Sequence, residues 1–291
     1  MAPLLLKPRS SPQEVHKVKP ASTSGRGRLI ALIGLPGMGK TSLAAQFPKP
    51  YFVIDPKESG VIDLQESGQI DSDIQWWQAD KFSDLIRFNQ DILNGSSTIP
   101  SDVKTLVYES ISGFEQQAMD FCCAMQFGSN WGDTAGGFNF YQKGDRITAE
   151  NYWNQLSMQF VALRNMGYNV LVTGHSEVKN VKNHKGADYL CETCRCNGPT
   201  WAVTDYYFEN IFFLSFEVQV EKENKFARAK ALTQTNRFLW GFKTPYQAAK
   251  NRCRIDSLIN TEPVNADEGP EKTFINMCHA CNWDRNTLRY L

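Results

Sequence analysis

Residues 29–41 read LIALIGLPGMGKT, and this stretch decides the fold. Residues 29–33 are all apolar and have the length of a buried strand. They run directly into a loop, 34–41, that matches G-x-x-x-x-G-K-[ST] at every fixed position. A helix is expected over 39–47, before Pro48 ends it. The order of buried strand, glycine loop and helix predicts a phosphate-binding loop at the edge of a sheet.

The residue types in this loop each have a chemical role. Glycines allow the backbone to curl so that successive N–H groups face a phosphate. Lys40 supplies a positive charge for the β- and γ-phosphates, and the Thr41 hydroxyl can ligate Mg²⁺. The pattern therefore predicts ATP and Mg²⁺ as cofactors. The residues expected to bind the nucleotide are Gly34, Pro36, Gly37, Met38, Gly39, Lys40, Thr41 and Ser42.

A carboxylate is needed beside the loop to complete the Mg²⁺ shell. The apolar strand 105–109 ends in Glu109, which we expect to hold Mg²⁺ together with Thr41. Aspartate is usual at this position, and the extra methylene of glutamate moves the carboxylate by about an ångström. A surface acid at the end of a strand is the alternative for Glu109.

Two further candidates follow other strands and complete the expected catalytic set of Lys40, Glu58, Glu109 and His175. Glu58, or Asp55 just before it, can orient the attacking water, although a turn role for segment 55–60 is equally open. His175 stands just after the buried strand 169–173 and can sense the γ-phosphate. A polar residue at the rim of the site is the alternative for His175.

Strands alternate with helices through most of the chain, which predicts an α/β fold with a mainly parallel sheet covered on both faces. A strand-rich part follows over 206–242, and a helix over 245–252 is expected to close the domain. The predicted organisation is a flexible basic tail 1–27, one P-loop domain 28–258 and a peripheral segment 259–291. The other predicted elements are strand 51–55 and helices 83–93, 113–127 and 149–166.

The charge of the chain is unevenly distributed. The 291 residues carry 31 basic and 31 acidic groups, but residues 1–28 hold six basic groups and one acid. The rest therefore has 25 basic and 30 acidic residues, a formal charge of −5, so any phosphate contact must be local. The tail is either a solvated leader or a partner-binding arm. The longest apolar run is too short to span a membrane, so a cytoplasmic, soluble protein is expected.

Eight cysteines raise the question of a metal site. His184 precedes Cys191, Cys194 and Cys196, and a second C-x₂-C pair stands at Cys278 and Cys281. Both patterns resemble half-sites for Zn²⁺, although 84 residues separate Cys194 from Cys278. The sequence leaves open a zinc-braced loop, formed by one group or by both together, or unliganded thiols. Cys122 and Cys123 are expected in helix packing.

Taken together, the motifs resemble the phage nucleotide-binding P-loop ATPases with a RecA-like core, AAA-type proteins that include the phage single-strand annealing ATPases. The resemblance covers roughly 28–258. It rests on 34–44, on 52–55 with Glu58 and Gly60, on 106–111, on 169–175 after an amphipathic helix, and on 249–252.

This resemblance implies an ATPase that acts on single-stranded DNA in phage-type recombination. It also implies a homo-oligomer, in which Lys250 or Arg252 would be placed to reach a neighbour. DNA-contacting loops are expected at 128–148 and 176–201, with ordinary surface loops as the alternative. Their aromatic and basic residues suit base stacking and phosphate contact, and they are Trp131, Phe138, Phe140, Tyr141, Lys143 and Arg146 in the first, and Lys179, Lys182, His184, Lys185 and Arg195 in the second.

Two other functions stay open from the sequence. A P-loop kinase for nucleotides or small molecules would use the cysteine segment as a braced lid, but no arginine-rich lid segment accompanies it. A nucleotide-binding scaffold with little hydrolysis would explain glutamate instead of aspartate at 109.

Overall fold

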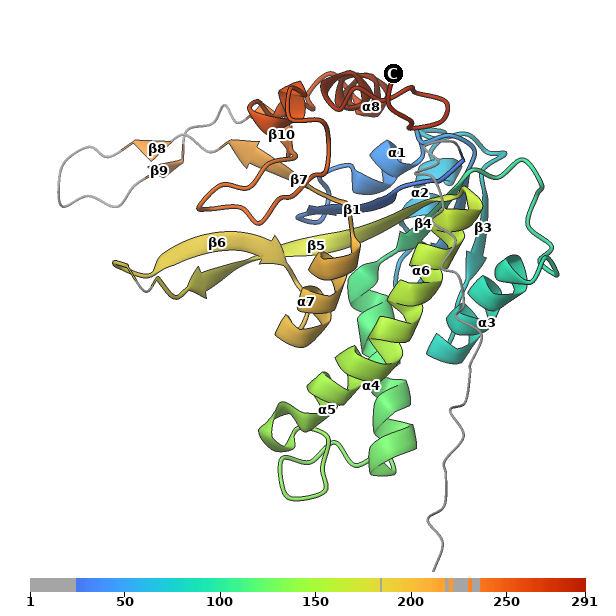
Figure 1. Cartoon of the computed structure of the whole chain (residues 1–291), viewed down its shortest axis with the longest axis vertical. Helices are drawn as coiled ribbons and strands as arrows, with labels where there is room; N and C mark the ends of the chain where they lie inside the picture. The colour runs from blue at the N-terminus through green and yellow to red at the C-terminus, as the bar shows by residue number, and fades with distance from the viewer. Residues whose placement is uncertain (1–24, 184, 218–219, 222–229, 232–235) are drawn as a thin grey trace, which may run out of the picture.

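The computed structural model describes residues 25–183, 185–217, 220–221, 230–231 and 236–291 (Figure 1). Nearly all of the predicted tail 1–27 lies outside the described residues, and so does His184.

A nine-stranded sheet forms the centre of the molecule, in the order β11-β10-β7-β1-β5-β4-β2-β3, with β6 paired to β5. The run from β7 to β3 is parallel throughout, whereas β6, β10 and β11 pair antiparallel. This confirms the predicted α/β class. The strands are β1 Leu29–Gly34, β2 Pro50–Ile54, β3 Gln75–Gln78, β4 Thr105–Glu109, β5 Asn169–Val181, β6 Tyr189–Cys194, β7 Asn210–Glu217, β10 Asn236–Trp240 and β11 Val264–Asn265, with a separate pair, β8 Val220–Glu221 and β9 Lys230–Ala231.

Helices cover both faces of the sheet (Figure 1). Helices α3, α4, α6 and α7 pack on one face, and α1, α2 and α8 pack on the other. The described α-helices are α1 Lys40–Ala44, α2 Gly60–Glu66, α3 Phe82–Leu93, α4 Ile111–Phe127, α5 Lys143–Ile147, α6 Asn154–Met166, α7 Gly198–Tyr207 and α8 Pro270–Ala280. A π-helical segment, Thr148–Trp153, leads into α6, and short 3₁₀ turns lie at Phe140–Gln142 and Leu258–Asn260.

Strand β1 explains why an unbroken apolar run is needed here. Leu29, Ala31 and Ile33 face the cluster with α3, α4, α6 and α7, whereas Ile30 and Leu32 face the cluster with α1, α2 and α8. Successive strand side chains point to opposite faces, so a strand covered on both sides needs apolar residues at every position. This burial anchors the glycine loop that follows.

The predicted helix over 245–252 is wrong. Residues in this segment form isolated bridges instead, Ile211 with Lys250 and Glu192 with Gln247. The side-chain amide of Gln247 also donates to Glu192 and Ser215 at 2.8 and 2.9 Å. These contacts with β6 and β7 hold the segment in a non-helical conformation, with a turn at residues 245 and 246, and override its helical composition.

The segment 259–291 is not peripheral, which corrects its predicted placement. Strand β11 extends the sheet, and α8 buries Phe274 and Met277 in the same cluster as α1. Trp283 is buried, and the Arg28 guanidinium lies 4.2 Å from its ring centroid. The segment thus completes the core on the face of the sheet that carries the P-loop helix.

The two expected long loops contain regular structure. Segment 128–148 includes α5, and Phe138 within it is fully buried against Phe127 and Trp131. Segment 176–201 is mostly a hairpin, because β5 continues past His175 to Val181 and pairs with β6. The aromatic residue Tyr141 is well exposed in the first segment.

Candidate nucleotide site

The glycine loop leaves β1 at its carboxyl end, where the parallel strands of the sheet also end. A Cβ at Gly34 would lie 2.4 Å from the backbone oxygen of Leu214 on β7, so only glycine fits there. Gly37 and Gly39 have φ of 76° and 90°, in the left-handed region that favours glycine. The loop therefore needs its glycines at these positions for close packing and for its curvature.

Lys40 is buried and folds back over its own loop. Its Nζ donates to the carbonyl oxygens of Gly34 at 3.0 Å and Leu35 at 2.8 Å. Burial lowers the pKa of Lys40, while the nearby carboxylates Glu109 and Glu58 oppose this shift. An incoming phosphate would offer this ammonium group stronger acceptors than the two carbonyls.

Thr41 and Glu109 form a pair at the base of the loop. The Thr41 hydroxyl donates to Oε1 of Glu109, and Oε2 of Glu109 is buried with no hydrogen-bond partner in the described part of the chain. A Cβ at Gly60 would lie 3.1 Å from Oγ1 of Thr41 and 3.3 Å from Oε1 of Glu109, so glycine keeps space open beside the pair. A buried carboxylate oxygen without a partner is costly unless a cation meets it. Thr41 and Glu109 therefore fit a Mg²⁺ site.

Glu109 differs electrostatically from the other acid in the site. Burial raises the pKa of Glu109 to about 7, although the hydrogen bond from Thr41 opposes the shift. The half-buried Glu58 has a lowered pKa, chiefly because His175 faces it. The Nε2 atom of His175 lies 3.6 Å from Oε1 of Glu58. Glu58 is therefore held ionised, in the form that can accept a hydrogen bond from a water molecule.

Asp55, the other acid considered for orienting water, has a structural role. Its Oδ1 accepts from the backbone N of Lys57 at 3.0 Å, and its Oδ2 accepts from Nε2 of Gln117 at 2.7 Å. Asp55 is buried, and a Cβ at Gly113 would lie 2.4 Å from its Cγ. It joins the end of β2 to α4 and leaves Glu58 as the acid that faces the cavity.

A cavity of about 850 Å³ unites the predicted site residues. The P-loop residues from Pro36 to Ser42 line it, as do Glu58, Glu109 and His175. Gly34 does not line the cavity, and it acts through its carbonyl contact with Lys40. The structure thus brings together side chains from β4, β5, the loop after β2 and the P-loop.

Several residues of the cavity escaped the sequence analysis, and Arg237 and Thr173 are two of them. Arg237 on β10 lines it, and its Nη1 would lie 3.8 Å from a Cβ at Gly39. Thr173 on β5 also lines it, and the buried Oγ1 of Thr173 has no hydrogen-bond partner among the described residues. Thr173 is a polar residue that directly follows the apolar run 170–172, and this change is visible in the sequence. Nothing in the local sequence marks Arg237, because the antiparallel pairing of β10 with β7 places it there.

The comparison with known families adds to this geometry. A family model described as an AAA domain matches residues 26–253, which is more than half of the chain. The chain belongs to the AAA domain family. The match includes the P-loop, Glu58 and Glu109 and ends before α8. Among curated proteins, none matches the chain.

The AAA assignment supports nucleotide binding at the P-loop, and proteins of this class typically use ATP and Mg²⁺. Within the described residues, none of the helices has the length and apolar character needed to cross a membrane.

The structure does not support the predicted zinc site. Cys194 and Cys196 lie in the cluster on one face of the sheet, whereas Cys278 and Cys281 lie in the cluster on the other. Cys191 and Cys194 are three apart on β6, so their side chains point to opposite faces of the hairpin. The described residues contain no group of three or more His, Cys, Asp or Glu that could hold a metal ion. The sixth expected ligand, His184, lies outside the described residues. Cys122 and Cys123 pack with Phe138, as expected.

Proposed function

We propose that this AAA domain protein binds ATP with Mg²⁺, hydrolyses it, and couples turnover to single-stranded DNA. The observation that carries the proposal is the cavity in which the P-loop, Glu109, Glu58 and His175 meet. A binding module needs only the P-loop, whereas a second, ionised acid facing the phosphate position suits hydrolysis.

The residues divide the reaction between them. Lys40 leaves the carbonyls of its own loop and binds the β- and γ-phosphates. Bound Mg²⁺, held by Thr41 and Glu109, would neutralise developing charge on the phosphates. Glu58 orients a water molecule toward the γ-phosphate and accepts its proton. Arg237 supplies a further positive charge beside Gly39.

His175 offers a route from the nucleotide to a DNA partner. It lies on β5, which continues without interruption into the hairpin with β6. The backbone oxygen of His175 accepts from the backbone N of Arg195 at 2.8 Å, so the base of the hairpin is joined to the sensor position. A change in the Glu58–His175 contact on ATP binding can thus move the hairpin.

The partner in this proposal is single-stranded DNA, in phage-type recombination, and the active form is a homo-oligomer. These finer statements rest on the resemblance of the ordered motifs to the phage ATPases. The exposed lysines Lys182 and Lys185 on the hairpin add local support. The first expected DNA segment, 128–148, follows the C-terminal end of α4. This helix has 17 residues and is about 25 Å long.

One assay tests the proposal. ATP hydrolysis is measured with and without a single-stranded oligonucleotide, for the wild type and for Lys40→Ala, with Lys81→Ala as a control at an exposed lysine outside the site. We expect DNA-stimulated turnover that Lys40→Ala abolishes. Phosphate transfer to an added nucleotide would instead indicate a kinase. Tight ATP binding without turnover would indicate a scaffold, and both outcomes overturn the proposal.

A further inference from the structure

A second cavity lies at the edge of the sheet opposite the P-loop. It has a volume of about 400 Å³, within the range of small-ligand sites, and its walls come from four parts of the chain. Arg26 precedes β1, Lys104 precedes β4, Asn169 begins β5, and Arg289 belongs to the C-terminal segment. Because β4 and β5 are parallel, this edge is a strand length, roughly 15 Å, from Glu109.

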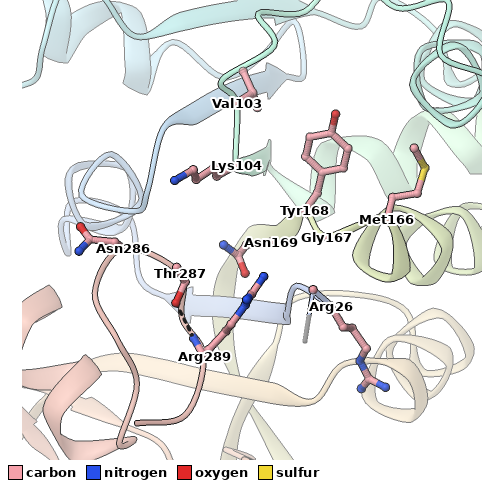
Figure 2. Close-up of a pocket in the computed structure, with 11 residues that line it drawn as sticks. Arg26, Val103, Lys104, Met166, Gly167, Tyr168, Asn169, Asn286, Thr287 and Arg289 are labelled. Atoms are coloured by element: carbon pink, nitrogen blue, oxygen red, sulfur yellow. Dashed lines mark hydrogen bonds between the residues drawn. The ribbon is translucent and has the colours of Figure 1, made fainter. Parts of the chain in front are cut away.

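The lining of this cavity is positively charged and offers hydrogen-bond donors. Three of its eleven residues are basic, and none is acidic. Arg26 bonds Glu209, but Lys104 and Arg289 form no salt bridge with any carboxylate that the structure describes. Figure 2 shows Lys104 and Arg289 on opposite walls, with Asn169 between them, while Arg26 points away.

Asn169 adds an oriented donor at the base of the cavity. Its side chain is buried, and its Oδ1 accepts from the backbone N of Arg28 at 3.2 Å. Its Nδ2 has no acceptor within hydrogen-bonding distance among the described residues, although it lies in the cavity lining. A buried amide held by its oxygen presents its NH₂ group to a ligand that accepts hydrogen bonds.

The C-terminal wall is held in place by specific contacts. Arg28 donates to the backbone oxygen of Leu288 and lies over the rings of Trp283 and Tyr290. Within the wall, the backbone N of Leu288 donates to the oxygen of Asp284 at 2.7 Å, and the backbone N of Asp284 donates to the oxygen of Arg289 at 2.7 Å. The backbone that carries Arg289 is therefore fixed before any ligand arrives, which lowers the cost of binding.

We infer that this cavity binds the phosphodiester backbone of single-stranded nucleic acid at a site separate from the nucleotide pocket. Lys104 and Arg289, which pair with no carboxylate among the described residues, and the Asn169 NH₂ group match phosphate oxygens. A chain of phosphates is favoured over a lone phosphate because Lys104 and Arg289 lie on opposite walls of the cavity, with Asn169 between them (Figure 2). This inference rests on the proposed DNA role. It assigns that role a specific site, although the chain outside residues 1–28 carries a formal charge of −5.

The test uses the full chain and a fluorescently labelled dT20 oligonucleotide. Binding is measured by anisotropy over a range of salt concentrations for the wild type, for Lys104→Gln/Arg289→Gln, and for the control Lys81→Ala/Arg254→Ala, which removes two exposed cations elsewhere. We expect the first double variant to weaken binding at least 10-fold at low salt. The magnitude of its salt slope should fall by about 1.4, since each phosphate contact on a single strand contributes about 0.7. The control should match the wild type.

The outcomes separate this inference from the proposed function. If the double variant binds dT20 like the wild type, the cavity is not the site, whereas DNA-stimulated turnover can still stand. If the wild type does not bind dT20 at all, the DNA role fails and the inference fails with it. If pyrophosphate at matched ionic strength and phosphate concentration displaces dT20, the cavity takes free polyphosphate, which also overturns the inference. Basal ATP hydrolysis should be unchanged in the double variant, because neither residue lies near the P-loop cavity.

Discussion

The Nε2 atom of His175 lies 3.6 Å from Oε1 of Glu58, although the two residues come from strands that are not neighbours. Glu58 follows β2, His175 lies on β5, and β4 with Glu109 stands between these strands. The contact therefore spans the carboxyl edge of the sheet above the Mg²⁺ candidate Glu109. It joins the acid assigned to the water molecule to the strand that continues into the hairpin.

Glu58→Gln should abolish most ATP hydrolysis and leave ATP binding nearly intact. A general base contributes roughly 10²–10⁴-fold to rate, and glutamine keeps the size of the side chain but cannot accept the proton. We expect turnover to fall at least 100-fold, with ATP affinity within about threefold of the wild type. Glu66→Gln, an exposed acid at the end of α2, is the matched control. Turnover that survives in Glu58→Gln would remove the general-base assignment.

His175→Ala should uncouple hydrolysis from DNA. The variant removes the contact with Glu58 but leaves β5 and its hairpin paired with β6. The ratio of turnover with and without single-stranded DNA should fall toward one. His175→Gln, which can still donate a hydrogen bond, should retain part of the stimulation. An unchanged ratio in His175→Ala would make this residue part of the rim only.

Glu109→Gln should stabilise the metal-free protein at neutral and alkaline pH. Burial raises the pKa of Glu109 from the ordinary 4.5 to about 7, so the folded state binds the proton more tightly than the unfolded state. This group thus makes stability fall as pH rises from about 4.5 through 7, and the cost is fully present above pH 7. Glutamine removes the charge and with it a cost of about 1–3 kcal/mol.

The measurement for Glu109 is thermal unfolding in EDTA at pH 5 and pH 8. The difference in Tm between Glu109→Gln and the wild type should be larger at pH 8. An equal difference at both values would contradict a raised pKa. Glu109→Asp, which restores the usual acid at this position, should keep or increase ATP turnover. Complete loss of turnover in that variant would show that the longer side chain is required.

Arg237→Ala should weaken ATP binding, because the guanidinium lies beside Gly39 in the cavity lining. Its orientation is held by Asp267, because Nε of Arg237 donates to Oδ1 of Asp267 at 3.5 Å. Loss of one charge-assisted phosphate contact should reduce affinity about 10-fold. Arg237→Lys should recover part of the loss, and Arg254→Ala, an exposed arginine paired with Asp256, is the control. Unchanged affinity in Arg237→Ala would place its guanidinium outside the phosphate contacts.

The sequence predicted the parts of the site that follow from local pattern. A strand covered on both faces must be apolar at every position, and the glycines of 34–41 are required by backbone geometry, so both are visible without a structure. Glu109 was found because it ends such a strand. Each of these inferences uses only neighbouring residues.

The parts that were missed depend on contacts between distant residues. Arg237 reaches the cavity only through the pairing of β10 with β7, and segment 245–252 is not helical because Gln247 and Lys250 bridge to other strands. Phe138, expected in a DNA-contacting loop, is buried between aromatic rings of its own segment and of α4. Tertiary contacts decide all three, and no local period reports them.

Trp283→Ala should destabilise the whole domain, although Trp283 lies in a segment expected to be peripheral. Its side chain is buried against Phe212 of β7, and Arg28 lies over its ring. Truncation of a buried tryptophan costs about 3–5 kcal/mol through lost burial and the cavity left behind. Urea unfolding should show this loss, while Trp76→Ala on the edge strand β3, with 39% of the side chain exposed, should cost much less. Equal effects of the two substitutions would mean that the C-terminal segment does not share the core of the AAA domain.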